Sequence, residues 1–389
     1  MSINFSFLKY FLVLSLVLNN SCKTAQGQSE IDKWKEQAEN ITIIRDDFGV
    51  PHIYGKTDAD AVFGLLYAQC EDDFNRVEQN YIWAIGRLAE VEGKEALYSD
   101  LRAKMFMSKE EAIANYNKSP DWLKKLCDAF ADGINYFLYT HPEVKPKLIS
   151  RFEPWLPMYF SEGSIGGDIE RISTEKIRAF YEDGRAFGMA EAARIKKSKE
   201  ELEPQGSNGI AISGKLTQSG NAMLLINPHT SFYFRGEVHM VSEEGLNAYG
   251  AVTWGQFFVY QGFNEKTGWM HTSTYTDVMD EFVEVFVEKE KKLFYVYGEE
   301  LRPVTQTEIV LKFKAKDGIE EAEFPVYRTH HGPVTHLINE SPVASAMMWE
   351  PVKALEQSFI RTKQSNYNGF RKMMDIRTNS SNNTVYADA

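Results

Sequence analysis

Hydrophobic and polar residues alternate near the start of the chain, and apolar residues then recur at helical spacing. Between residues 41 and 55 the alternation is interrupted by glycine and proline, which predicts a strand, a turn and a second strand. From 58 to 91 apolar residues recur every three or four positions, which predicts long amphipathic helices. A second helical region is predicted over 109–140, with Asp121 as the N-cap of its main helix.

The pattern changes beyond a charged stretch at 174–203. Arg, Lys and Glu dominate that stretch, and this composition predicts an exposed helix that continues into a linker. Segments 209–214 and 222–226 then flank turn residues, which predicts a hairpin whose second strand is buried. Strands are also predicted at 250–254, 281–288, 293–297, 307–313, 324–328 and 383–389. Helices first and strands later favour an α+β fold.

The first residues have the layout of an export signal. Lys9 precedes an apolar run from Tyr10 to Leu18, and small and polar residues follow up to Cys22. The run is shorter than the roughly 20 residues that a membrane-spanning helix needs. Cys22 resembles the lipid-attachment cysteine of bacterial lipoproteins, and lipidation and plain removal of the signal both stay open. We expect export to the periplasm or to a lipid anchor at the cell envelope.

Composition narrows the classes of function. The chain has 389 residues, of which 43% are hydrophobic, enough for two or three domain-sized cores. A net charge of −12 without a cluster of Lys and Arg argues against a nucleic-acid partner. Cys70 and Cys127 lie among apolar residues in helical patterns, so we expect buried thiols and no disulfide framework. No spacing of Cys and His indicates a zinc site.

The predicted linker meets the first predicted strand at Gly206-Ser207-Asn208. Alone, this tripeptide is an ordinary turn. A cut before Ser207 would give it a free α-amino group, which titrates at roughly 7.7–8 and could take the proton of its own hydroxyl. Gly206 suits the bond to be cut because glycine bends freely and admits close attack on its carbonyl. The sequence therefore predicts a serine that cuts first its own chain and then a substrate.

These residues resemble a known family. The run 205–214, with 220–229 behind it, closely resembles the start of the β-chain in the penicillin acylase family of N-terminal nucleophile hydrolases. Upstream segments resemble the opening of the family's α-chain, and the matches together cover nearly all of the chain after the signal. These segments are 45–53, 60–64 and 86–90.

The resemblance implies an α+β fold, the four-layer αββα sandwich of this family. It divides the chain into a signal peptide (1–22), an α-chain region (23–185), a linker cut or removed on maturation (186–206) and the N-terminal part of a β-chain (207–389). The two chains would stay together as a heterodimer.

The resemblance also implies roles for single residues. Gly206 and Ser207 would flank the bond that is cut, and Ser207 would then be the nucleophile. His229, in an Asn-Pro-His element, would orient and polarise the serine and its amine. The backbone N–H of Ser273 and the side-chain amide of Asn383 would stabilise the oxyanion. The alternative is that all of them are ordinary turn and strand residues.

A calcium site is a further expectation from the resemblance. Asp277 and Asp280 lie three residues apart, and two such carboxylates can share a hard cation. Asp168 resembles the third ligand that the α-chain supplies in some family members. A solvated loop is the alternative for this segment. We expect no organic cofactor.

The expected reaction is hydrolysis of an N-acyl compound through an acyl-Ser207 ester. Candidate small-molecule substrates are β-lactam antibiotics, N-acyl homoserine lactones and acylated peptides, and the Asn-Pro-His element favours aliphatic acyl groups. Several aromatic residues could line an acyl pocket, although ordinary core is the better interpretation for most. They are Phe232, Tyr233, Trp254, Phe257, Phe258 and Tyr260.

One feature departs from the family pattern. Family β-chains continue much further than the 183 residues that follow Gly206. Two other interpretations therefore stay open: a truncated chain that never matures, and an envelope binding lipoprotein that kept the fold without the chemistry. In every interpretation, any membrane contact would come only from a lipid on Cys22.

Overall fold

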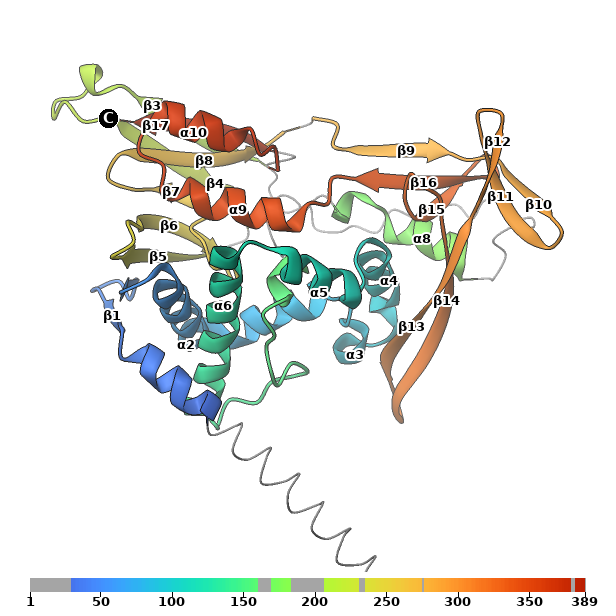
Figure 1. The fold of residues 1–389 in the computed structure, drawn as a ribbon, viewed down its shortest axis with the longest axis horizontal. Helices are drawn as coiled ribbons and strands as arrows, with labels where there is room; N and C mark the ends of the chain where they lie inside the picture. Colours follow the sequence, from blue (N-terminus) through green and yellow to red (C-terminus); the bar gives the residue numbers. More distant parts are fainter. Residues whose placement is uncertain are drawn as a thin grey trace, which may run out of the picture.

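The computed structural model describes residues 29–159, 169–182, 206–230, 235–274, 276–378 and 382–388. The predicted signal peptide with Cys22, the ligand candidate Asp168 and nearly all of the predicted linker lie outside these ranges. The described residues form two lobes, each with its own hydrophobic cluster (Figure 1). Within these ranges, no helix is both long and apolar enough to cross a membrane.

A seven-stranded sheet forms the centre of the larger lobe. Its strand order is β1 (Ile41–Arg45), β2 (Pro51–Gly55), β5 (Arg235–Ser242), β6 (Asn247–Thr253), β7 (Gln261–Phe263), β8 (Thr267–Ser273) and β17 (Asn382–Asp388). β1 and β2 form the predicted antiparallel pair, and β17 lies at the edge beside β8. β2 pairs in parallel with β5. Strands from both sides of the Gly206–Ser207 bond therefore share one sheet.

Helices cover one face of this sheet. α2 (Asp58–Ala84) packs on β2 and β5 and along α6 (Asp121–Thr140). The predicted N-cap of α6 is wrong by one residue, because Pro120 holds the extended backbone there and Asp121 takes the first helical position. Cys70 and Cys127 are free and buried in α2 and α6, as predicted. α9 (Pro351–Arg361) and α10 (Tyr367–Met374), which the sequence did not predict, add apolar side chains to the same cluster.

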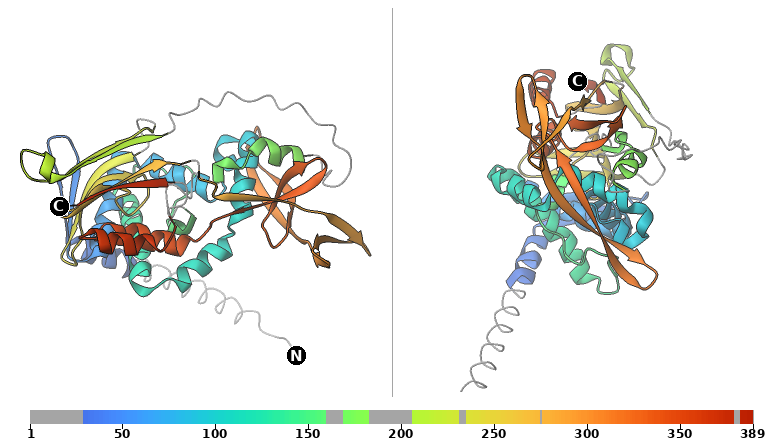
Figure 2. Two further views of the ribbon diagram at one scale, coloured as in Figure 1. Left: turned by 90° about the horizontal axis from the view of Figure 1, so that it is seen from above. Right: turned by 90° about the vertical axis from the view of Figure 1, so that its right-hand side faces the viewer.

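The hairpin of β3 (Ser207–Ile212) and β4 (Met223–Pro228) lies on the other face. In Figure 2 the hairpin and α9 with α10 lie on opposite sides of the strands. The approach is close: a Cβ atom on Gly209 would lie 2.6 Å from Met270 Sδ and 2.9 Å from Val385 Cγ2. The larger lobe thus has three successive layers, helix, sheet and sheet, in agreement with the α+β expectation.

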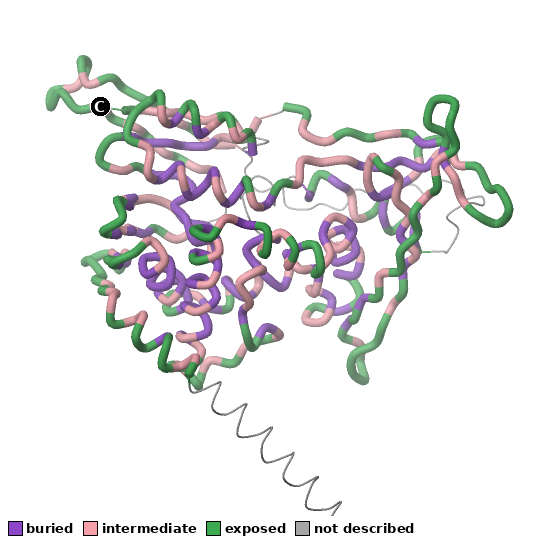
Figure 3. The backbone as a smooth tube through the Cα atoms, in the orientation of Figure 1, coloured by how far each residue is buried: buried purple, intermediate pink, exposed green. Residues whose placement is uncertain are grey.

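The expectation of a buried second strand in this hairpin is wrong. Met223 and Leu225 are 57% and 48% exposed, and Figure 3 shows the hairpin largely in exposed and intermediate colours. Side chains alternate between the two faces of a strand, and only one face of the hairpin meets β8 and β17. A run of apolar residues therefore did not mean that both faces are covered.

The smaller lobe combines short helices with antiparallel strands. Its helices are α3 (Ala89–Glu92), α4 (Leu97–Phe106) and α8 (Thr174–Tyr181), and its strands are β9 (Met279–Val283), β10 (Phe286–Lys289), β11 (Lys292–Tyr297), β12 (Glu300–Pro303), β13 (Thr305–Ala315), β14 (Gly318–Arg328), β15 (Val334–Ile338) and β16 (Ser341–Met347). The single strand predicted over 281–288 is therefore two strands, which belong to different sheets.

The predicted exposed helix after residue 174 is only partly exposed. In α8 the side chains of Ile177, Phe180 and Tyr181 are buried against the smaller lobe. The Tyr181 hydroxyl donates a hydrogen bond to the carbonyl of Val334 at 2.7 Å. This short apolar face, which is visible in the sequence, packs the chain against the smaller lobe just before the predicted linker.

Candidate active site

Ser207 begins β3 at the end of the hairpin, next to the last residues of β4. The strand register places Ser207 opposite Pro228, and the backbone N–H of His229 donates to the Gly206 carbonyl at 3.2 Å. Gly206 has a φ of +128°, a backbone conformation that favours glycine. The hairpin therefore fixes the carbonyl group that precedes Ser207.

The hydroxyl of Ser207 lies against that same carbonyl. Ser207 Oγ donates to Gly206 O at 2.5 Å, while Thr272 Oγ1 donates to the carbonyl of Ser207 at 2.9 Å. Thr272 is near the end of β8, so the first residue of the hairpin is attached to the central sheet. Both carbonyl groups beside the predicted cleavage point are held by hydrogen bonds.

The alternation of side chains shows which face each group occupies. Ser207 and Gly209 are two residues apart on β3, so both face β8 and β17. Asn383 is paired with Thr272, whose side chain reaches Ser207, so Asn383 shares the face of the sheet that meets the hairpin. Asn383 is exposed and Ser207 is partly exposed. The two side chains therefore lie on facing surfaces, at the same end of the strands.

Ser273 is at the same place along the sheet. It is the last residue of β8, it is exposed, and the register pairs it with Asn382. The structure therefore brings Ser207, Ser273 and Asn383 to one end of the stacked strands, although they are far apart in the sequence.

The imidazole of His229 takes a different direction from its backbone. Its Nε2 lies 2.9 Å from Asn227 Oδ1 and 3.2 Å from Asn208 Nδ2. Asn208 and Asn227 are paired on β3 and β4 and point away from β8, opposite to Ser207. The structure thus brings the backbone of His229, rather than its ring, into hydrogen-bond contact with the Gly206–Ser207 segment.

His271, in β8, is a buried histidine that the sequence did not predict as part of the site. His271 has a pKa well below 6.5 because of burial, and the charges of Arg361 and Arg235 lower it further. Its Nδ1 lies 3.1 Å from Thr384 Oγ1, and the Arg235 guanidinium stacks 4.5 Å from the ring centre of Tyr260. His271, the residue before Thr272, is therefore neutral and lies on the helix side of the sheet.

The structure leaves the predicted metal ligands incomplete. Asp277 and Asp280 are both exposed, at the start of β9, and Asp168 lies outside the described residues. Within the described ranges, no three side chains of His, Cys, Asp or Glu converge on a point where an ion could bind. A calcium ion would need Asp168 or another residue to complete its ligands.

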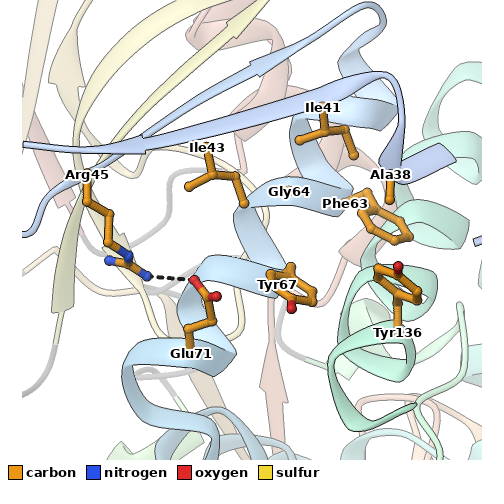
Figure 4. Close-up of a pocket in the computed structure, with 9 residues that line it drawn as sticks. All are labelled: Ala38, Ile41, Ile43, Arg45, Phe63, Gly64, Tyr67, Glu71 and Tyr136. Carbon is orange, nitrogen blue, oxygen red and sulfur yellow. Dashed lines mark hydrogen bonds and ion pairs between the residues drawn. The ribbon is translucent and has the colours of Figure 1, made fainter. Parts of the chain in front are cut away.

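The aromatic residues considered for an acyl pocket are mostly core. Phe257, Phe258 and Tyr260 are at most 2% exposed and Trp254 packs against the same cluster, while Phe232 and Tyr233 lie outside the described residues. A hollow of about 420 Å³ lies at the far edge of the sheet, between β1, α2 and α6 (Figure 4). It is lined by Ala38, Ile41, Ile43, Arg45, Phe63, Gly64, Tyr67, Glu71 and Tyr136 and is remote from Ser207.

The family of the chain follows from comparison with known sequences. The sequence profile of the penicillin amidase family matches residues 40–389. The chain belongs to this family. The resemblance found at Gly206-Ser207 thus extends over nearly all of the described fold, and the α+β arrangement agrees with it.

Several acylases are similar to this chain. An acyl-homoserine lactone acylase QuiP of Pseudomonas fluorescens is 24% identical over 81% of this chain and 43% of its own length. A penicillin acylase 2 proenzyme of a Pseudomonas species is 23% identical over 76% of this chain and 43% of its own length. The chain thus spans less than half the length of these relatives.

Among solved structures, a thermostable penicillin G acylase from Alcaligenes faecalis matches with a TM-score of 0.38 and 19% identity. The match covers 46% of this chain and 32% of that one. At this TM-score it adds nothing to the family assignment.

Proposed function

We propose that this chain carries the nucleophile of an amidohydrolase that splits N-acyl compounds into a carboxylic acid and an amine. The observation that carries the proposal is the position of the Ser207 hydroxyl against the Gly206 carbonyl, at the strand ends where Asn383 and Ser273 also lie. Membership in the penicillin amidase family supports the same reaction class.

The first step would be self-cleavage. Ser207 Oγ attacks the carbonyl carbon of Gly206, the C–N bond to Ser207 breaks, and the nitrogen takes up the hydroxyl proton. The Gly206 acyl group is then an ester on Ser207, and water hydrolyses it to a carboxylate and the free hydroxyl. Charge develops on the Gly206 oxygen during attack, and the His229 N–H at 3.2 Å stabilises it there.

The second reaction would use the new α-amino group of Ser207 as the base. It takes the hydroxyl proton, directly or through water, while Oγ attacks the amide carbonyl of the substrate. The Ser273 N–H and the Asn383 amide donate to the oxyanion, the protonated amine leaves, and water releases the acid from Ser207. His229 would help to orient the new amine, which requires a different position of its ring from the one bonded to Asn227.

For the substrate we propose N-acyl homoserine lactones first, because several similar proteins are named as acylases of these compounds. Penicillin-type β-lactams are the second candidate, supported by the relative named penicillin acylase 2 proenzyme. We further propose export of the protein and, with Asp168 as third ligand, a structural calcium ion at Asp277 and Asp280.

The test is release of free acid and amine from N-acyl homoserine lactones of different chain lengths and from penicillin G. The unmodified chain should release both products, Ser207→Ala should release none, and Ser207→Cys should retain some self-cleavage. Binding of the lactone without turnover, unchanged in Ser207→Ala, would instead support the binding lipoprotein. A chain that stays uncut and inert would support the truncated remnant.

A further inference from the structure

Two histidine rings face each other across the parallel strands β2 and β5. His52 and His239 are paired in register, and their Nδ1 atoms lie 2.9 Å apart. Both residues are partly exposed and point away from the helices, because their neighbours Ile53 and Met240 are buried on the helix side. The pair therefore lies on the face of the sheet that the hairpin with Ser207 covers further along.

The contacts of the other ring nitrogens determine where the hydrogens are. Nε2 of His239 lies 2.8 Å from Asn247 Oδ1, and the amide of Asn247 is oriented because its Nδ2 donates to Glu265 at 3.0 Å. An amide oxygen only accepts, so Nε2 of His239 carries a hydrogen. Nε2 of His52 is buried and has no hydrogen-bond partner among the described residues; a carboxylate oxygen of Asp46 lies 3.5 Å from it and would repel a lone pair on this nitrogen.

These assignments leave a conflict at the centre of the pair. In a neutral imidazole only one nitrogen carries hydrogen, so there are two arrangements: either His52 Nδ1 donates to His239 Nδ1 and leaves the Nε2 lone pair of His52 facing Asp46, or both Nδ1 atoms present lone pairs to each other at 2.9 Å. Two lone pairs at that distance repel unless a cation lies between them. That cation is either one proton or a metal ion.

The surroundings favour positive charge. Asp46 faces His52 and Glu265 bonds to the amide that holds His239, while Glu237 accepts from Tyr249, whose ring lies about 6 Å from both imidazoles. The neighbouring Arg45 turns its guanidinium to Glu71 and Asp72 on the helix side. Apart from Arg45, the charged side chains in these contacts are thus acidic.

We propose that the facing Nδ1 atoms of His52 and His239 bind one divalent transition-metal ion of the zinc or copper class, with water completing the coordination. Imidazole nitrogens suit these ions, and ligating histidines usually donate their other N–H to a carboxylate or carbonyl oxygen, as His239 does to Asn247. With metal–nitrogen bonds of about 2.0–2.1 Å, a tetrahedral ion would hold the nitrogens about 3.3 Å apart. The rings need to separate only slightly from their present contact.

The position of the site has a consequence for the proposed function. His52 precedes the Gly206–Ser207 bond and His239 follows it, and the two are 187 residues apart. If that bond is cut, the metal joins the two resulting chains. Metal binding itself does not depend on cleavage, so the two proposals can fail separately.

The experiment is titration of the metal-free full chain with Zn²⁺ in a calorimeter, at a pH above the titration range of histidine. We expect one strong Zn²⁺ site per chain, with affinity at least tenfold lower in His52→Gln and in His239→Gln. His141→Gln, which removes a histidine outside the pair, is the matched control and should not change the affinity. Asn247→Ala should weaken binding about 10–100-fold, because the hydrogen position on His239 is no longer fixed.

Two measurements keep the test decisive. Circular dichroism without metal shows whether each variant is folded, and the EPR spectrum of Cu²⁺ on the unmodified chain should show coupling to two imidazole nitrogens. Absence of Zn²⁺ binding, or equal binding by the folded double variant of His52 and His239, would overturn the proposal.

Discussion

The two faces of the seven-stranded sheet differ in what they hold. The helix face is a continuous hydrophobic cluster, in which residues such as Phe63, Phe130 and Trp269 are at most 2% exposed. The opposite face carries Asn383 and the His52–His239 pair, and it is partly covered by the hairpin that begins with Ser207. The comparison suggests that one face supplies stability and the other supplies reactive groups, held in place by backbone contacts.

The largest expected effect is on the side of the sheet that the hairpin covers. Ser207→Ala removes the attacking oxygen, so cleavage at Gly206–Ser207 and turnover should both be abolished with the fold retained. Denaturing gel electrophoresis measures the cleavage. Ser213→Ala, on the same hairpin outside the site, is the control and should cleave normally. Efficient processing of Ser207→Ala would be incompatible with the proposed chemistry.

Truncation on the helix face should act on stability. Phe130 is fully buried in α6, and Phe130→Ala should lower the free energy of unfolding by about 3–5 kcal/mol. Urea denaturation measures the loss. At temperatures where the variant is folded, its cleavage rate should stay within a few-fold of that of the unmodified chain. A loss of cleavage as large as that of Ser207→Ala would show that the two faces do not have separate roles.

Asn383 tests the oxyanion assignment. Asn383→Ala should lower kcat about 10²–10³-fold, with a smaller change in KM, because such a donor acts mainly in the transition state. Steady-state kinetics with an N-acyl substrate of the active protein measures both constants. The neighbour Asn382 points to the opposite face, so Asn382→Ala should affect kcat less. Equal effects of the two variants would argue against the role of Asn383.

Gly209 tests the close contact between the hairpin and the sheet. A Cβ atom there would lie 2.6–3.1 Å from Met270 and Val385, so Gly209→Ala should displace β3, destabilise the chain by about 1–3 kcal/mol and slow cleavage. The adjacent Ile210 is 53% exposed, and Ile210→Ala should cost less. Thermal unfolding and the time course of cleavage compare the two variants. A slower cleavage in Ile210→Ala than in Gly209→Ala would contradict the close contact at Gly209.

The smallest expected effect depends on pH. Burial, with Arg361 and Arg235, holds the pKa of His271 well below 6.5, whereas the unfolded chain binds a proton there at its ordinary pKa. The stability contribution of neutral His271 is thus present above about pH 6.5 and is lost as the pH falls below it. His271→Gln should flatten this decrease in urea unfolding, and His141→Gln should not. An unchanged slope in His271→Gln would contradict a buried neutral ring.

The sequence predicted the family and those helices and strands whose formation depends on residues close together in the chain. β1, β2, α2 and the β3–β4 hairpin follow from alternation, helical spacing and turn residues within short stretches. α9 and α10 were missed because they are short and mix polar with apolar residues. Burial of β4 was overestimated because the sequence does not show which face another layer covers.

The site was predictable as a set of residues but not as a geometry. The positions of Ser207, Ser273 and Asn383 came from the resemblance, and the structure places them at one end of the strands. The Thr272–Ser207 hydrogen bond and the direction of the His229 ring depend on contacts between strands, which spacing along the chain does not contain.

Self-cleavage before Ser207 is tested most directly by intact mass combined with N-terminal sequencing of the full-length protein purified from its native cell envelope. We expect two chains, one of which begins Ser-Asn-Gly-Ile at Ser207. A single uncut chain that still contains the Gly206–Ser207 bond would contradict the self-activated hydrolase.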